Sequence, residues 1–245
     1  MKTLCVDIGN SCIKTAVFNG SRLLYSDEQE IGKFLRKNNA FVKYKKYNIC
    51  KSLICSVVPC LNTQVVTLIK KSLDIVPLIV NKTCTISLRT LYSKKTPLGN
   101  DRVINIYGAL CTFKPPFIVV SLGTAITLDL VSRDGIHQGG YILPGIAMKA
   151  RALHTFTAQL PNVKVSALRK DYGIDTMSSI NAGLVYGAVA TVEGLINRLK
   201  SHCKGKVAVI ATGGDVTAIQ NYCSSFDHVV KKHTLNSLNL ILHSL

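Results

Sequence analysis

Short apolar runs separated by small polar turns open the chain, over residues 4–8, 13–18 and 22–25. The turns between them are Gly9-Asn10-Ser11 and Asn19-Gly20. An Asn-Gly pair between two apolar runs is a strong hairpin signal. The pattern therefore predicts three antiparallel strands at the start of the chain.

The pattern then alternates between strand and helix. After a polar, helix-compatible segment over 28–47, an apolar run predicts a buried strand over 52–58, and apolar residues at helical spacing predict a helix over 61–73. A further strand is predicted over 75–80, and a helix opens at Asp101. Antiparallel strands followed by alternating strands and helices indicate a mixed α/β fold.

A proline-containing segment, residues 113–117, breaks any helix and predicts a hinge. After it the opening pattern recurs, with strands predicted over 117–125, 126–131 and 139–145. Its alignment sets Asp7 over Ser121, Gly9 over Gly123 and Asn10 over Thr124, an offset of 114 residues. The recurrence predicts two related halves, 1–114 and 115–245.

Helices dominate the remainder of the second half. They are predicted over 145–159, 177–201 and 234–244, and a strand over 207–211 runs into Thr212-Gly213-Gly214. The long middle helix contains Gly183, Gly187 and Gly194. Small residues at this spacing predict close packing of that helix against a neighbour.

The composition is that of a folded protein. The chain has 245 residues and a net charge of +17, and its hydrophobic content of 47% excludes a disordered chain. Its nine cysteines are an odd number without a C-x-x-C motif, which indicates reduced thiols. The apolar runs fall short of the roughly 18 residues that span a bilayer. We expect a soluble cytoplasmic protein with no membrane partner.

The basic charge allows two interpretations. Lysine clusters such as 43–47 and 231–232 suit a nucleic-acid-binding face, and they equally suit a solvated surface. The second interpretation is favoured, because the clusters are short and scattered and no recognised nucleic-acid-binding motif accompanies them. We expect no specific nucleic-acid partner, although a positive field attracts anionic substrates.

Three glycine-containing turns follow strands and can approach an anion closely. The turn at Gly9-Asn10-Ser11 is open to an ordinary hairpin interpretation, because small polar turns are common. A matching turn at Thr124 and a third at Gly213-Gly214 favour a two-sided phosphate site. Neither the P-loop motif nor G-x-G-x-x-G occurs, which argues against the two commonest nucleotide-binding folds.

The acidic residue Asp101 and its neighbour Arg102 open a predicted helix. An acid at this place often only caps the helix or interacts with its dipole. The functional alternative is that Asp101 takes a proton from a substrate hydroxyl while Arg102 holds a substrate oxyanion, as phosphoryl transfer to an alcohol requires. The six histidines show no zinc-binding spacing, and no nucleophilic hydrolase motif is present.

A set of motifs occurs in order along nearly the whole chain. It comprises Asp7-Ile8-Gly9-Asn10-Ser11 with Lys14, Gly99-Asn100-Asp101-Arg102, Gly123-Thr124-Ala125-Ile126-Thr127-Leu128-Asp129, residues 139–145, residues 157–161, residues 173–176 and Thr212-Gly213-Gly214. As a set it resembles the type III pantothenate kinases. The resemblance implies two ribonuclease H-like halves of the actin, hexokinase and acetate-kinase superfamily with a central cleft. It also implies a homodimer that phosphorylates pantothenate with ATP, the first step of coenzyme A synthesis.

The resemblance assigns roles to individual residues. Asp101 is the expected proton acceptor, and Mg²⁺ is expected to bridge the ATP phosphates near Asp7. The expected ATP-binding residues include Gly213 and Gly214 of the third glycine turn. The full set is Asp7, Gly9, Asn10, Ser11, Lys14, Thr124, Gly213 and Gly214. The expected pantothenate-binding residues are Tyr92, Gly99, Asn100, Arg102 and Thr176.

One position departs from the family pattern. The family usually has an aspartate before the second glycine turn that binds a monovalent cation, K⁺ or NH₄⁺, and this chain has Ser121 there. Loss of the carboxylate weakens a cation site built from oxygen ligands. We expect a weaker cation requirement, a substitute positive charge or reduced activity, and Asp129 can substitute only if its strand points it inward. The alternative function is a regulatory relative that binds nucleotide or pantothenate without efficient turnover.

Overall fold

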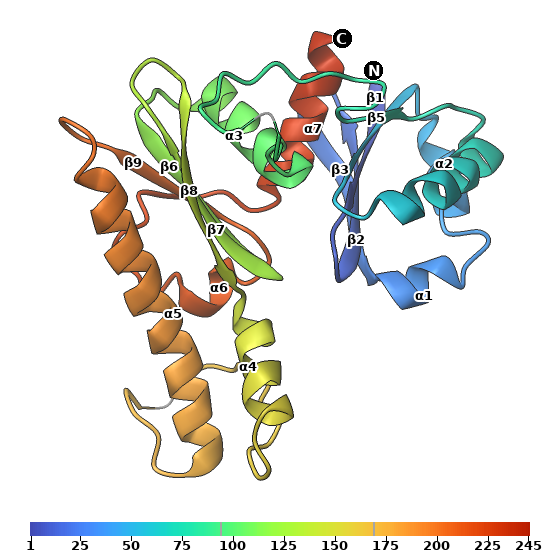
Figure 1. The fold of residues 1–245 in the computed structure, drawn as a ribbon. Coiled ribbons are helices and arrows are strands. Elements are labelled where there is room, and N and C mark those ends of the chain that lie inside the picture. Colours follow the sequence, from blue (N-terminus) through green and yellow to red (C-terminus); the bar gives the residue numbers. More distant parts are fainter. Residues whose placement is uncertain (94, 169) are drawn as a thin grey trace. The chain divides into compact units, whose positions relative to one another are not determined.

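The computed structural model describes residues 1–93, 95–168 and 170–245 (Figure 1). The chain divides into two compact units. The first unit contains Met1–Leu88, Ser93–Thr112 and His233–Leu245, and the second contains Arg89–Tyr92 and Phe113–Lys232. This division differs from the expected one at residue 114 in two places, because the C-terminal helix packs in the first unit and Arg89–Tyr92 packs in the second.

The sheet of the first unit has the strand order β3-β2-β1-β4-β5. The strands are β1 (Lys2–Ile8), β2 (Cys12–Asn19), β3 (Arg22–Glu30), β4 (Lys51–Ser56) and β5 (Leu78–Ile79). The predicted antiparallel meander is confirmed, and β4 and β5 join it in parallel. The helix-compatible segment over 28–47 is helical only in part: β3 continues to Glu30 along β2, and α1 (Ile31–Leu35) and a 3-10 helix (Val42–Tyr47) follow.

Helices cover both faces of this sheet. On one face, α2 (Pro59–Leu73) buries Val65 and Ile69 against Leu4, in a cluster that includes other even-numbered residues of β1. On the other face, α3 (Asn100–Thr112) and α7 (His233–Ser244) pack around Cys5 and Cys55. Because side chains alternate along a strand, Asp7 lies on the same face as Cys5, the one that α3 covers.

The second unit repeats this topology. Its sheet has the order β8-β7-β6-β9-β10, built from β6 (Phe117–Leu122), β7 (Ala125–Val131), β8 (His137–Pro144), β9 (Ala208–Thr212) and β10 (His228–Val229). The first three strands are antiparallel, and the last two join in parallel. The predicted recurrence of the opening pattern is therefore confirmed as a repeated sheet.

The core of the second unit lies between its sheet and the helices α4 (Ile146–Thr155), α5 (Thr176–Lys200) and α6 (Val216–Ile219). Figure 1 shows the N-terminal half of α5 running beside α4 beyond the end of the strands. Among the described residues, α5 alone is long and apolar enough to span a membrane. Its buried face packs into the core of the unit, as expected of a core helix in a soluble domain.

The glycines of α5 do not pack as predicted within the described part of the chain. Gly183, Gly187 and Gly194 are exposed, and a Cβ atom at any of them meets nothing within 4 Å. The intervening residues Leu184, Ala188 and Val192 face the core instead. The long helix therefore has one apolar buried face and one outer face of small residues.

Candidate functional site

Four side chains form a row across the sheet of the first unit. Asp7 of β1 lies opposite Lys14 of β2, and Lys14 lies opposite Glu28 of β3. On its other side Asp7 pairs with Cys55 of β4. Residues paired directly across strands share one face of a sheet. The Lys14 Nζ atom is 3.7 Å from Glu28 Oε1, so the lysine lies between two carboxylates.

The N-terminus of α3 brings Asp101 to this row. Asn100, the first residue of the helix, donates from Nδ2 to the Ser56 carbonyl at 3.1 Å and accepts from Asn81 Nδ2 at 2.9 Å. These bonds fix the start of α3 at the end of β4. The charge of Asp101 raises the pKa of both Asp7 and Cys55. The first unit thus links Asp7, Lys14 and Asp101 electrostatically.

Gly99 leaves space for the Asp101 side chain. A Cβ atom at this position would lie 2.8 Å from Asp101 Oδ1, closer than real Cβ contacts allow. The glycine that precedes the helix therefore permits the aspartate to turn back over the helix start. The next residue, Arg102, is only 5% exposed.

The environment of Asp7 raises the pKa of its carboxyl to about 6. Burial is the largest cause, the positive charge of Lys14 acts in the opposite direction, and Asp101 and Glu28 raise the pKa further. The negative charges of Asp101 and Glu28 act on Asp7 against the positive charge of Lys14. The described residues contain no group of three or more metal-ligating side chains.

We expect the stability of the ATP-free protein in EDTA to fall as the pH rises from about 4 to about 6. An aspartate with a raised pKa binds more protons in the native state than in the unfolded state over that range, so the free energy of unfolding decreases with pH. The expected loss is about 2 kcal/mol, or roughly 5 °C in Tm, after allowing for partial exposure of Asp7. Thermal unfolding at each pH measures it. For Asp7→Asn, the loss of stability between about pH 4 and about pH 6 should be smaller by about 2 kcal/mol. A pH profile identical to that of the wild type would contradict the raised pKa of Asp7.

In the second unit, the turn between β6 and β7 carries Thr124 at the end of an apolar strand. The Gly145 amide donates to the Thr124 carbonyl at 3.0 Å. A Cβ atom at residue 145 would lie 2.0 Å from the Gly123 carbonyl oxygen. The backbone leading into α4 therefore supports this turn from behind, and only glycine permits that approach.

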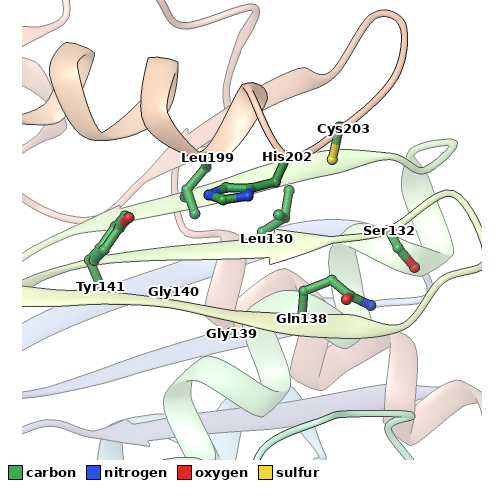
Figure 2. Close-up of a pocket in the computed structure, with 9 residues that line it drawn as sticks. All are labelled: Leu130, Ser132, Gln138, Gly139, Gly140, Tyr141, Leu199, His202 and Cys203. Carbon is green, nitrogen blue, oxygen red and sulfur yellow. The ribbon is translucent and has the colours of Figure 1, made fainter.

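The third glycine turn borders a cavity of about 520 Å³. Gly214 and Asp215 line it from the turn, and Arg151 and Lys164 add two positive charges. A second cavity of about 370 Å³, shown in Figure 2, has Leu130, Tyr141 and His202 among its lining residues. It contains none of the predicted site residues. The first cavity is therefore the better candidate for an anionic ligand in this unit.

Ser121 lies in a row of hydroxyl groups. It pairs with Thr127 of β7 and with Thr212 of β9, and the Thr212 hydroxyl donates to the Val230 carbonyl at 2.8 Å. The possible substitute, Asp129, is only 2% exposed and is bonded to His137 at 2.9 Å. The expectation of weaker cation binding at Ser121 therefore stays a prediction, with neutral oxygens around the serine.

The remaining predicted pantothenate residues are in the second unit. Tyr92 is partly exposed in the segment that packs against β8, and Thr176 is exposed as the first residue of α5. Asp175 caps that helix by accepting from the Ser178 amide at 2.8 Å. Gly173 lies so close to the helix start that a Cβ atom would be 2.0 Å from Ser179 N.

The sequence did not single out Glu28, Cys55 or His137. Glu28 lay in a segment expected to be helical, and Cys55 was one of several cysteines in apolar runs. Both reach the Asp7 row through pairing between strands that no local pattern reveals. A hairpin turn over residues 9–12 does place residue 14 opposite residue 7, so that pair was available from the sequence.

Comparison with known proteins identifies the family. The model of the type III pantothenate kinase family matches residues 3–198. The chain belongs to the type III pantothenate kinase family. It is 31% identical to the type III pantothenate kinase of Finegoldia magna, over 97% of this chain and 95% of that protein. It is 34% identical to that of Persephonella marina, over 86% of each chain. The chain is therefore a kinase, and its family links it to coenzyme A biosynthesis.

Solved structures show the same fold. A putative Baf family transcriptional activator from Campylobacter jejuni matches with a TM-score of 0.63 at 24% identity, over 98% of both chains. An inorganic polyphosphate/ATP-glucomannokinase from an Arthrobacter strain matches with a TM-score of 0.50 at 12% identity, over 100% of this chain and 99% of that one. The chain therefore shares the mixed α/β fold of these structures, the fold class that its sequence predicted.

Proposed function

We propose that the chain transfers the γ-phosphoryl group of ATP to the primary hydroxyl of pantothenate, giving 4′-phosphopantothenate, in the cytoplasm. The observation that carries the proposal is that the charge of Asp101 acts on Asp7, which pairs with Lys14 in the first unit. Phosphoryl transfer needs a group that accepts the hydroxyl proton and positive charge near the phosphates. A chain of this family with those groups adjacent has the necessary side chains.

The predicted site residues of the first unit have separate proposed roles. Asp101 orients the pantothenate hydroxyl and accepts its proton, while Arg102 and Asn100 help to hold the rest of that substrate. Lys14 and the backbone of Gly9, Asn10 and Ser11 bind the phosphates. Bound Mg²⁺, held near Asp7, would neutralise phosphate charge during transfer.

The second unit supplies the remaining proposed ATP contacts. Thr124 offers a hydroxyl to the phosphates, and Gly213 and Gly214 approach the nucleotide at the cavity that Arg151 and Lys164 line. The two positive charges support an anionic ligand there. Because Ser121 and its paired threonines offer only neutral oxygens, we propose that K⁺ or NH₄⁺ binds weakly and that turnover depends little on it.

The test is ADP release measured in a coupled assay with Mg-ATP, with and without pantothenate, in K⁺, NH₄⁺ and Na⁺ buffers. We expect pantothenate-dependent release in all three buffers, with rates within about threefold, a difference of less than 1 kcal/mol. Absence of pantothenate-dependent release in every buffer would contradict the kinase proposal and favour the regulatory alternative. Activity confined to K⁺ and NH₄⁺ would contradict only the proposal about Ser121.

We also propose that the kinase is a homodimer through the outer face of α4 and α5. Between these helices lies an apolar groove of about 680 Å³, which Leu153, Phe156 and Gly183 help to line. Phe156 is 85% exposed, although a phenylalanine gains stability from burial. The exposed glycines of α5 would let a second copy approach closely. Pantothenate would then contact Thr176 near this interface.

We expect Phe156→Asp to weaken the dimer by about 100-fold in Kd, because the change places a charge where an aromatic ring would be buried. Sedimentation velocity over a range of protein concentrations measures this. Val76→Asp is the matched control, since Val76 is 67% exposed in the first unit and should leave the dimer intact. A wild-type monomer at all concentrations, or an unaffected Phe156→Asp dimer, would contradict the proposed interface.

A further inference from the structure

A buried histidine and aspartate of the second unit are not explained by any role proposed above. His137 of β8 is fully buried, and Asp129 of β7 is 2% exposed. The His137 Nε2 atom lies 2.9 Å from Asp129 Oδ1, and its Nδ1 atom lies 2.8 Å from Thr90 Oγ1. Removing two such polar side chains from water is costly unless each atom is paired. Here both ring nitrogens have partners.

A bulge in β8 produces this arrangement. Leu130 pairs with Gly139, whereas Val131 pairs with His137, so Gln138 is an extra residue in the strand. Regular alternation would have turned His137 to the same face as Gly139. The bulge instead turns it to the face of Asp129, and Gly139 permits this with a φ of +127°. Bulges often redirect a side chain near functional sites.

His137 connects the sheet to the segment Arg89–Tyr92. Its amide donates to the Arg89 carbonyl and its carbonyl accepts from the Leu91 amide, both at 2.9 Å. The Arg89 side chain also donates to the Asp134 carbonyl at 3.3 Å. These bonds explain why four residues from the region before α3 pack with the second unit rather than the first.

The same contacts orient Tyr92. Its amide donates to Thr90 Oγ1 at 3.0 Å, and its ring centroid lies 5.9 Å from that of His137. With a proton on Nε2, the ring satisfies the whole chain of bonds: His137 donates to Asp129, and Thr90 donates to Nδ1 while accepting from the Tyr92 amide. Each group thus fixes the next one.

We propose that His137 is a positioning residue for pantothenate binding. Through its bonds to Thr90 and Asp129, it holds the segment Arg89–Tyr92, including the Tyr92 ring, against β8. The proposal rests on the proposed function and on the predicted contact of Tyr92 with pantothenate. His137 and Asp129 themselves touch no substrate. Their effect should therefore fall on pantothenate binding and leave ATP binding and the chemical step almost unchanged.

Thr90 gives the sharpest test, because it is exposed and its hydroxyl can be removed without a cavity in the core. Thr90→Val keeps the side-chain shape and removes the hydroxyl, whereas Thr90→Ser keeps the hydroxyl. Thr63→Val, at an exposed position of α2, is the matched control. For each variant we would measure kcat, the KM for pantothenate and for ATP, and amide hydrogen exchange at Leu91.

In Thr90→Val we expect the pantothenate KM to rise about tenfold, as for loss of one net hydrogen bond, with kcat and the ATP KM within about twofold. Exchange at Leu91 should accelerate by a similar factor. Thr90→Ser should restore both values, and Thr63→Val should change neither. An unchanged pantothenate KM, an equal rise in both KM values, or unchanged exchange at Leu91 would overturn the proposal. If wild-type enzyme shows no pantothenate-dependent turnover, the proposed function fails, and exchange at Leu91 alone then decides whether Thr90 anchors the segment.

Discussion

Replacing Asp101 with asparagine should reduce kcat for pantothenate phosphorylation by about 10³-fold, within the usual range for loss of a general base. The asparagine keeps the size of the side chain beside Gly99 but cannot accept the substrate proton. Because Asp101 acts on the acceptor hydroxyl, the affinity for ATP should change by less than about threefold, or 0.7 kcal/mol. Coupled ADP release measures turnover, and calorimetric titration with a non-hydrolysable ATP analogue measures binding.

A matched control separates this effect from a general loss of negative charge. Asp74 is an exposed aspartate of the same unit that ends α2 with a φ of +55°, a conformation that asparagine also tolerates. Asp74→Asn should therefore retain wild-type turnover and stability. If Asp101→Asn turned over at a rate near that of wild type, Asp101 would not be the base. If it lost ATP binding as well, its role would lie in holding the nucleotide site together.

The elements that local patterns determine could be predicted, and those that depend on distant pairing could not. The hairpins and the helices α2, α3, α5 and α7 follow from residues close together in the sequence. The extension of β3 to Glu30 depends instead on the length of β2 beside it, because an edge strand can carry the polar residues that read as a helix. The two-residue β5 is shorter than its apolar run suggested.

The candidate site shows the same division. The glycine turns and the Asp7–Lys14 pair follow from the hairpin, and the approach of Asp101 needs α3 to be packed on the correct face. The position of His137 could not be predicted by alternation, because a single extra residue in β8 reverses the face. The net charge of +17 predicted a basic surface. The Asp7 row instead contains two carboxylates, Asp7 and Glu28, and one lysine, Lys14.

Replacing Gly213 with alanine should destabilise the enzyme by about 3–5 kcal/mol, or roughly 10 °C in Tm. Gly213 has a φ of +105°, and a Cβ atom there would lie 1.9 Å from the Leu122 carbonyl oxygen. The Leu122 carbonyl oxygen is held in place, because it accepts from the Asp215 amide at 3.1 Å and because Leu122 of β6 pairs with Ile126 of β7. The substitution therefore combines backbone strain with a clash against backbone.

Thermal unfolding without ATP measures this effect on the fold separately from any effect on nucleotide binding. Gly194→Ala is the control in the same unit, because Gly194 lies in α5 with open space around it. Alanine there should be neutral or raise stability by up to about 1 kcal/mol, since it favours the helix. A Gly213→Ala protein that melts within about 2 °C of wild type, a difference below roughly 1 kcal/mol, would show that the turn can move away from Leu122. In that case, the contact of the third glycine turn with β6 would not be the interaction that keeps Gly214 at the cavity.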